Sequence, residues 1–307
     1  MFSNEEINKI RESGKIARKL LLESKKRIKE GVIESDRQLV NFIDEKIDDF
    51  KENKNIKKAF PVNISINEIA AHYTPFEKEY FFKEEDIIKI DLGISIDGYI
   101  ADNALTIYLG DDEKKKKLVE ASKNALEEVK KIIKKDIKNN ELGSKIEKTI
   151  KSFGFNPIYN LGGHSIERNN LHSGVFIPNY DSKENKKLKP GVYAIEPFAT
   201  DGIGYVKDSG FSNIVKLSEL RVRLPLNLKK YYNILFKEFN NLPFSVLDIK
   251  KLLGLEEDKV MHLVNLLEKF KVLYKYPILI EKSKGLVSQH EHTFLILENK
   301  VFVITDD

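Results

Sequence analysis

The sequence contains no cysteine, which excludes disulfide bonds and thiolate metal sites and leaves histidine and carboxylates as the strong metal ligands. No apolar run approaches membrane-spanning length, and the first residues, MFSNEEINKI, lack the apolar core of a signal peptide. The charges nearly cancel: 52 Lys and Arg against 48 Asp and Glu leave +4, too little to indicate nucleic-acid binding by itself. We therefore expect a cytoplasmic protein without a membrane partner or a specific nucleic-acid partner.

The 307 residues are enough for one large domain or two unequal ones, and 33% charged against 41% hydrophobic residues is an ordinary balance for a globular chain. Apolar residues at helical spacing predict helices over 3–29 and 35–51, with Gly31 between them and Ser35 or Asp36 as an N-cap.

Two further helices are predicted over 113–137 and 141–152. The first carries a Lys-rich face interleaved with Glu. Such a face is typical of a solvated helix surface, and it indicates a polyanion contact only weakly.

Strand-like segments alternate with these helices. They lie at 62–66 and 69–73, in the hairpin DIIKIDLGISIDGYIADNALTIYLG, in NPIYNLGGHSI and in GVYAIEPFAT. The mixture predicts an α+β fold. The apolar strand IIKID in the first half and VYAIE in the second both end in an acid, which suggests two similar halves that face each other across a shared site.

Residues 225–285 differ from the rest, because they read as three short helices followed by a strand at 274–281, which is the winged-helix pattern. The third helix, EEDKVMHLVNLLEKF, carries more acidic than basic residues and would repel phosphates. We expect an insert at 225–285 that shapes a neighbouring pocket, and a catalytic domain formed by 1–224 and 286–307.

The hairpin gives the sharpest geometric prediction. Asp97-Gly98 is a strong two-residue turn signal, and the resulting register places Asp102 opposite Gly93. Asp91 then lies on the same face, within about 7–8 Å as a diagonal neighbour. Two carboxylates in such apolar strands are costly unless their charge is compensated. They are either ordinary strand-end aspartates or ligands that converge on a metal.

Three more residues could join them. His164 follows two glycines, Glu196 ends the strand VYAIE, and Glu291 begins the apolar run in SQHEHTFLIL, with His290 and His292 on the opposite face. A lone histidine such as His164 is often only structural. One histidine and four carboxylates form an oxygen-rich set that favours Mn²⁺, Fe²⁺ or Co²⁺ and suits a two-metal centre.

Five motifs in order, AAHYTP, DLGISIDGYIADNALTI, GGHSIERNNLHSG, AIEPFATDG and SQHEHTFLI, make the sequence resemble the methionine aminopeptidases of the pita-bread fold. AAHYTP and the winged-helix-like insert are similar to type 2, in its archaeal form. The resemblance covers nearly the whole chain. It implies an α+β pita-bread fold with pseudo-two-fold halves.

The resemblance also implies a function. The enzyme would remove the N-terminal methionine of nascent proteins that have a small second residue. A hydroxide held between two divalent metal ions (Co, Mn, Fe or Zn) would attack the first peptide bond. A monomer, with transient ribosome contact at most, is expected.

The site roles implied by the resemblance fall into three groups. The metal ligands are Asp91, Asp102, His164, Glu196 and Glu291, with Asp102 and Glu291 bridging both ions. The catalytic residues are His72, His172 and Glu196, and the substrate-binding residues are Phe60, His72 and His172.

Two departures from the family pattern concern pocket shape only: His290 stands where an aromatic residue is common, and Asn169 where a tyrosine is common. Two alternative functions are open. An X-Pro dipeptidase would normally carry a separate N-terminal domain, whereas only two helices precede the first strand here. An inactive pita-bread protein that binds RNA or ribosomes would have lost metal ligands, whereas all five positions are filled.

Overall fold

The computed structural model describes residues 2–50, 55–76, 78–220 and 222–306. Its helices are α1 (Asn4–Lys29), α2 (Asp36–Phe50), α3 (Glu113–Ile132), α4 (Asn139–Ser152), α5 (Leu226–Phe239), α6 (Val246–Leu253) and α7 (Glu257–Lys269). None of these helices combines the length and the apolar character that crossing a membrane requires.

The strands of the described residues form four sheets with antiparallel pairing. The first contains β1 (Ile56–Lys58), β2 (Asn63–Ile66), β4 (Ile87–Ile96) and β5 (Tyr99–Tyr108). The second contains β6 (Asn156–Pro157), β10 (Phe198–Thr200) and β14 (Val287–Gln289). The third contains β3 (Ile69–Ala71), β11 (Val206–Leu217), β12 (Phe244–Ser245) and β13 (Leu273–Glu281). The fourth contains β7 (Gly162–Ile166), β8 (Phe176–Pro178), β9 (Gly191–Ile195), β15 (His292–Ile296) and β16 (Val301–Val303).

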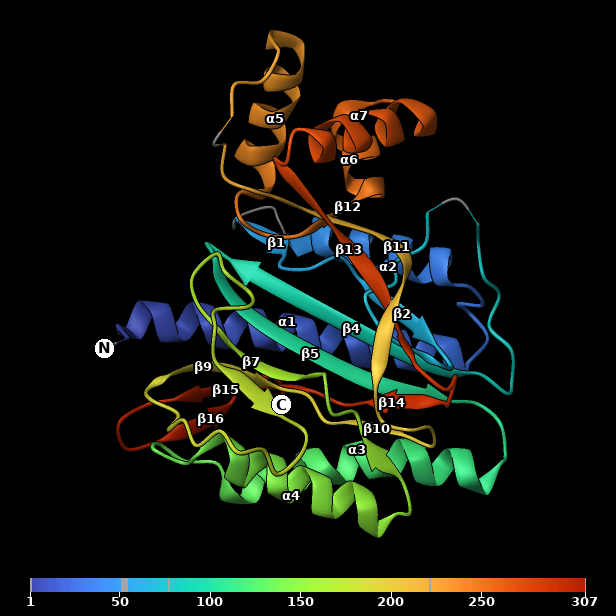
Figure 1. Cartoon of the computed structure of the whole chain (residues 1–307), viewed down its shortest axis with the longest axis vertical. Helices are drawn as coiled ribbons and strands as arrows, with labels where there is room; N and C mark the ends of the chain where they lie inside the picture. The colour runs from blue at the N-terminus through green and yellow to red at the C-terminus, as the bar shows by residue number, and fades with distance from the viewer. Residues whose placement is uncertain (1, 51–54, 77, 221, 307) are drawn as a thin grey trace.

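Helices α1 and α2 pack against the first sheet (Figure 1). A capping box in which Ser3 and Glu6 satisfy each other's backbone N–H groups starts α1. The buried stripe of α1, including Ala17 and Leu21, meets Ile90 and Leu105 of the hairpin in one hydrophobic cluster. This half therefore holds β4 and β5 between helices on one side and the centre of the molecule on the other.

Helices α3 and α4 cover the second half of the chain and lie side by side at the bottom of Figure 1. Leu126 of α3 and Ile146 of α4 share a hydrophobic cluster with Ile195 of β9 and Phe294 of β15. The two halves are thus each built of a helix pair on a sheet. Their inner strands, β4 and β5 from one half and β7, β9 and β15 from the other, carry or directly adjoin the five expected metal ligands.

The hairpin register agrees with the prediction from the sequence. Asp97 and Gly98 both have positive φ, 53° and 88°, as a two-residue turn that matches strand twist requires. Gly93 faces Asp102 in the β4–β5 ladder, and Asp91 lies two residues further along β4. Local turn chemistry therefore fixes the relative position of the two acids.

The three helices and the strand expected within 225–285 are present as α5, α6, α7 and β13. The helices lie at the top of Figure 1, and β13 runs from them toward the centre. The helices have a hydrophobic cluster of their own, which includes Leu235, Ile249 and Val264. From this cluster β13 runs back beside β11 and ends against β3. The division of the chain into a catalytic domain and an insert stays a prediction.

Several boundaries differ from those expected. The helix predicted over 113–137 ends at Ile132, because Ile133 has an extended backbone with ψ 129°. The strand predicted over 69–73 ends at Ala71, because His72 adopts a left-handed conformation with φ 61°. The helix predicted over 141–152 begins at Asn139, and position 51 of the helix predicted over 35–51 lies outside the described residues.

The packing of α1 on the C-terminal segment gives a test of the fold. A Cβ atom at Gly14 would lie 2.3 Å from Cγ2 and 2.4 Å from the carbonyl oxygen of Ile304. We expect Gly14→Ala to lower the free energy of unfolding by about 1–3 kcal/mol, because the backbone has to move, in spite of the better helix propensity of alanine. Urea unfolding measures this effect. Lys15→Ala, on the exposed face of α1, should change stability by less than about 0.5 kcal/mol, and equal effects of the two substitutions would contradict the packing.

Candidate metal centre and active site

A cavity of about 400 Å³ lies between the two halves of the chain. Its walls include all three histidines that the sequence pointed to and three of the four acids. Of the expected site residues, the lining contains Phe60, His72, Asp91, Asp102, His164, His172 and Glu196. Glu291 is 1% exposed and lies behind this surface. The fold therefore gathers residues that are far apart in the sequence around one cavity.

The five expected ligands form two overlapping groups. Ligand atoms of Asp102, His164 and Glu291 lie within 4.8 Å of one another, and so do those of Asp91, Glu196 and Glu291. Glu291 belongs to both groups. Such an arrangement has room for two cations with a shared carboxylate.

The acids are held by very few protein donors. Gln289 places one amide Nε2 between two of them, 3.1 Å from Oδ2 of Asp91 and 3.2 Å from Oε2 of Glu196. Oδ1 of Asp102 and both carboxylate oxygens of Glu291 are buried without a hydrogen-bond partner among the described residues. Buried oxygens of this kind are costly unless a cation or donor satisfies them.

Burial and mutual repulsion dominate the electrostatics of the acids. Burial raises the pKa of Asp91 to about 6. Burial and then the Asp91 charge raise the pKa of Asp102, and the same two causes followed by the Asp102 charge raise that of Glu196. The pKa of Glu291 is raised by burial and by the other three acids. No lysine or arginine in the described ranges forms an ion pair with any of these carboxylates, so a divalent cation fits the donor set.

The histidines around the cavity are held in the neutral form. Burial lowers the pKa of His164 to about 4, and its Nε2 lies 4.0 Å from Oδ2 of Asp102 and 3.9 Å from Oε1 of Glu196. Burial, offset in part by the Pro277 carbonyl, lowers the pKa of His72 to about 4. A neutral imidazole nitrogen can ligate a metal or exchange a proton by hydrogen bonding.

His172 stands at the mouth of the cavity, where its side chain is exposed, yet its ring centroid is 4.3 Å from that of His164. Desolvation and the neighbouring His164 and His72 lower its pKa well below the usual value.

Phe60 is buried and joins an aromatic wall, which we define as the rings of Phe60, His72 and Tyr276. The ring centroids of Phe60 and His72 are 5.6 Å apart, and Tyr276 stands edge-on to both at 5.5 and 5.3 Å. His172 reaches Phe60 edge-on at 6.1 Å. His72 and His172 therefore lie outside the acid cluster and beside the apolar ring of Phe60.

Comparison with known proteins agrees with this geometry. The sequence pattern of metallopeptidase family M24 matches residues 8–222. The chain belongs to this family. It is 42% identical over 300 residues to the methionine aminopeptidase of Methanocaldococcus jannaschii, which covers 97% of each chain. The resemblance to methionine aminopeptidases expected from the sequence is confirmed.

Solved structures give the fold. A thermophilic Arx1 superposes with a TM-score of 0.83 at 18% identity and covers 99% of this chain and 91% of its own. Methionine aminopeptidase from Thermotoga maritima superposes with a TM-score of 0.68 at 23% identity and covers 100% of this chain and 98% of its own. The α+β pita-bread fold is therefore confirmed, and the family is one of metal-dependent peptidases.

Thr293 and Asn103, which the sequence analysis did not single out, form hydrogen bonds with the backbone of two of the acids. Asp102 donates its N–H to Oγ1 of Thr293 at 2.7 Å and accepts from that hydroxyl at 2.7 Å. Asn103 donates to the carbonyl of Glu291. Gln289 and Thr293 lie two residues before and after Glu291, so the alternation of a strand would have placed them on its face.

Lys89 was also missed. It is fully buried two residues before Asp91, and Nζ donates to the carbonyls of Asn67 at 3.0 Å and Val287 at 2.9 Å. Burial lowers the pKa of Lys89 to about 7. Nothing in the sequence indicated that Lys89 bridges two backbone carbonyls, because these carbonyls belong to segments far from it in the chain.

The histidines on either side of Glu291 bond away from the acid cluster, as the alternation of strand faces predicts. Nδ1 of His290 lies 2.9 Å from Oγ of Ser122, and Nδ1 of His292 lies 2.9 Å from Oγ1 of Thr305. Asn169, the other departure from the family pattern, has φ 57° and donates its N–H to the carbonyl of Gly98 at 2.9 Å.

The raised carboxyl pKa values predict that metal binding releases protons, because a ligating carboxylate has to be deprotonated. At pH 6, Asp91 alone would be about half protonated in the metal-free chain. His164 is already neutral at this pH and contributes none. We expect release of at least about half a proton per chain on Mn²⁺ binding, falling as the pH rises. Calorimetry in two buffers with different ionisation enthalpies measures it. Glu291→Gln should release fewer protons, and zero release by the unmodified chain would contradict the raised pKa values.

Proposed function

We propose that this chain is a type 2 methionine aminopeptidase that removes the N-terminal methionine of nascent proteins, preferring a small second residue. One observation carries the proposal: four buried or half-buried carboxylates and His164 converge at a cavity bounded by aromatic and apolar side chains. The identity to a methionine aminopeptidase over nearly all of both chains supports it.

The cavity suits an unbranched thioether side chain. Its apolar lining includes Phe60, Ala71, Leu171 and Phe198. Sulfur makes favourable contacts with aromatic rings, and a flexible unbranched chain fits an irregular apolar space. Phe60, His72 and His172 are the proposed substrate-binding residues.

Two divalent cations (Mn, Fe, Co or Zn) are the proposed cofactor. Asp91, Asp102, His164, Glu196 and Glu291 would hold them, with Asp102 and Glu291 shared. When bound, the cations would polarise the carbonyl of the first peptide bond and lower the pKa of a water. The carboxylates fix where these charges sit, and Gln289 keeps Asp91 and Glu196 aligned.

Glu196 is the proposed proton shuttle. It follows β9 directly, borders the cavity, and burial together with Asp91 and Asp102 raises its pKa. A carboxylate that borders the cavity can take a proton from the attacking water and pass it to the leaving amine.

His72 and His172 are the proposed catalytic histidines without a metal. Both border the cavity. Burial lowers the pKa of His72 to about 4, and desolvation by the surrounding groups together with the neighbouring His164 and His72 lowers that of His172, so both are neutral at physiological pH. Nδ1 of His72 is buried without a partner among the described residues. A neutral imidazole can donate to the scissile carbonyl or to the leaving nitrogen without adding a charge.

We also propose a cellular location and partners for the enzyme. It is a cytoplasmic monomer with no membrane or specific nucleic-acid partner. Its contact with the ribosome, through the nascent chain, is transient at most. Residues 225–285 are an insert that shapes access to the cavity, since Tyr276 of β13 touches Phe60 and His72.

Peptide cleavage by metal-stripped protein tests the proposal. Met-Ala-Ser and Ala-Pro peptides are incubated with the chain while Mn²⁺, Fe²⁺, Co²⁺ and Zn²⁺ are titrated separately. We expect cleavage of Met-Ala-Ser that saturates at two ions per chain. Cleavage of Ala-Pro alone would indicate an X-Pro dipeptidase, and no cleavage with any metal would favour an inactive binding protein.

Asp102→Ala should abolish cleavage and lower the metal content, because it removes a shared carboxylate and leaves two cations short of one negative charge. Elemental analysis after gel filtration measures the metal. Asp111→Ala, which removes a 99% exposed carboxylate, is the control and should bind metal normally. Two ions bound at normal affinity by Asp102→Ala would refute the shared role.

His72→Ala should lower kcat by roughly 10²-fold or more with metal content unchanged, as expected for loss of a positioned hydrogen-bonding group. Steady-state kinetics and metal analysis on the same sample test this. His262→Ala, on α7, should leave both quantities at the normal values. Loss of metal in His72→Ala would instead place that histidine among the ligands.

A further inference from the structure

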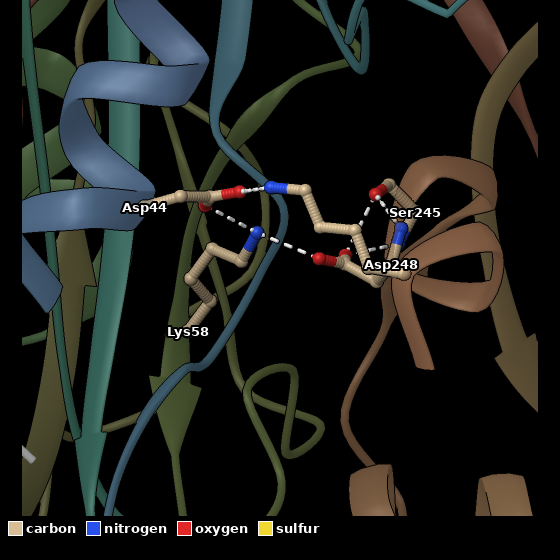
Figure 2. A network of polar contacts seen from close by, with 5 residues as sticks. Asp44, Lys58, Ser245 and Asp248 are labelled. Atoms are coloured by element: carbon tan, nitrogen blue, oxygen red, sulfur yellow. Dashed lines mark hydrogen bonds and ion pairs between the residues drawn. The ribbon is translucent and has the colours of Figure 1, made fainter. Parts of the chain in front are cut away.

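Lys58 joins the first half of the chain to the helical segment, which comprises α5, α6 and α7, through two partly buried ion pairs. Its Nζ lies 2.8 Å from Oδ1 of Asp44 on α2 and 2.8 Å from Oδ1 of Asp248 on α6. Figure 2 shows Lys58 reaching from one side toward both carboxylates, with Ser245 beside Asp248. The three side chains are only 17%, 14% and 12% exposed.

The network has little freedom to rearrange. Oδ2 of Asp248 accepts from the N–H of Ser245 at 2.8 Å and from its hydroxyl at 2.7 Å, so one oxygen caps α6 while the other accepts from Lys58. Asp44 also pairs with Lys251 of α6. The charges of the two lysines and the two aspartates thus balance, and the hydrogen-bond partners of each carboxylate fix its orientation.

On the catalytic side, Lys58 is the last residue of β1 and faces Ile94 of β4. The next residue, Ala59, donates its N–H to the carbonyl of Gly93 at 2.8 Å, and Phe60 follows directly. Gly93 is the residue opposite Asp102. Lys58 therefore anchors the short segment that presents Phe60 to the cavity.

On the helical side, the same ion pairs hold α6, which packs with the start of the strand that carries Tyr276. Ile249 of α6 and Leu273 of β13 belong to one hydrophobic cluster, and β13 leads from there to Tyr276. Oγ of Ser212 on β11 donates to the carbonyl of Tyr276 at 2.8 Å. Asp248 is thus connected to Tyr276 through α6 and β13, and Tyr276 meets Phe60 edge-on at 5.5 Å within the hydrophobic cluster that both share.

Apolar packing contributes to this geometry, since Phe60 and Tyr276 share a hydrophobic cluster. Leu247 packs against both the cluster of the first half and the cluster of the helical segment. Such contacts have no preferred direction, whereas a lysine between two oriented carboxylates specifies both distance and angle.

We propose that Lys58 is a specificity-positioning residue that sets the spacing of the aromatic wall, and thereby the preference of the cavity for the unbranched methionine side chain over a branched one. This inference rests on the proposed function of the cavity. It assigns to Lys58 no contact with the substrate; Lys58 acts through Phe60 on one side and Tyr276 on the other.

The test compares Met-Ala-Ser with Leu-Ala-Ser in the full-length, metal-loaded chain. We expect Lys58→Met to lower the ratio of kcat/KM for Met over Leu by about tenfold, within the range that small shape changes in an apolar pocket produce. KM for Met-Ala-Ser should rise by about tenfold, with kcat changed less than about threefold, because the acid cluster is left intact. Lys58→Arg should restore most of the selectivity.

The matched control is Lys9→Met. Lys9 also lies between two carboxylates, 2.8 Å from Glu5 and 3.0 Å from Asp97, but on α1. It should keep normal KM and selectivity. If Lys58→Met does not fold, Lys58→Met combined with Asp248→Asn replaces it, because Asp44 still has Lys251 and no buried carboxylate is left without a cation.

A second readout separates this inference from the proposed function. Calorimetry of L-methionine amide and L-leucine amide with the metal-free chain measures the pocket without catalysis, and Lys58→Met should reduce the difference between the two affinities. Absence of peptide cleavage by the unmodified chain would overturn the proposed function alone. Unchanged selectivity in a folded Lys58 variant, a fall in kcat at constant KM, or the same effect in Lys9→Met would overturn the role of Lys58.

Discussion

The convergence of four buried or half-buried carboxylates without a lysine or arginine partner, among the residues described, is the constraint on which the rest of this structure depends. In addition to burial, the charge of Asp91 raises the pKa of Asp102, Glu196 and Glu291. A chain that folds around such a cluster needs either protons or cations to compensate it. The fold supplies one amide donor, from Gln289, and leaves oxygens of Asp102 and Glu291 for a cation to satisfy.

The architecture follows from the need to hold these acids rigidly. Each half places a helix pair behind a sheet, so the strands that carry the acids are backed by close packing. The two halves are then joined at the site itself: Thr293 exchanges hydrogen bonds with the backbone of Asp102, and the N–H of Glu291 donates to the carbonyl of Ala104 at 3.0 Å. The same contacts therefore position the acids and join the two halves.

The aromatic wall depends on a different set of contacts. Phe60 comes from the first half and Tyr276 from β13, so the wall crosses the boundary between the strands that carry the acids and the segment that contains α5, α6 and α7. The position of Phe60, which lines the cavity, is only as well defined as the contacts behind it. Here that contact is partly ionic and directional, through Asp44, Lys58 and Asp248.

The sequence by itself determined what local chemistry controls. Asp97-Gly98 specified the turn, the turn specified the register, and the register put Asp91 and Asp102 on one face. The apolar periodicity gave the helices, with errors at ends such as Ile132, where a single residue changes its backbone angles. The order of motifs gave the family. Only the tertiary structure decided which distant groups meet: Gln289 between two acids, Lys89 between two carbonyls, and Lys58 between two helices. These partners are contributed by segments far apart in the chain, and neither spacing nor propensity encodes a distance through space.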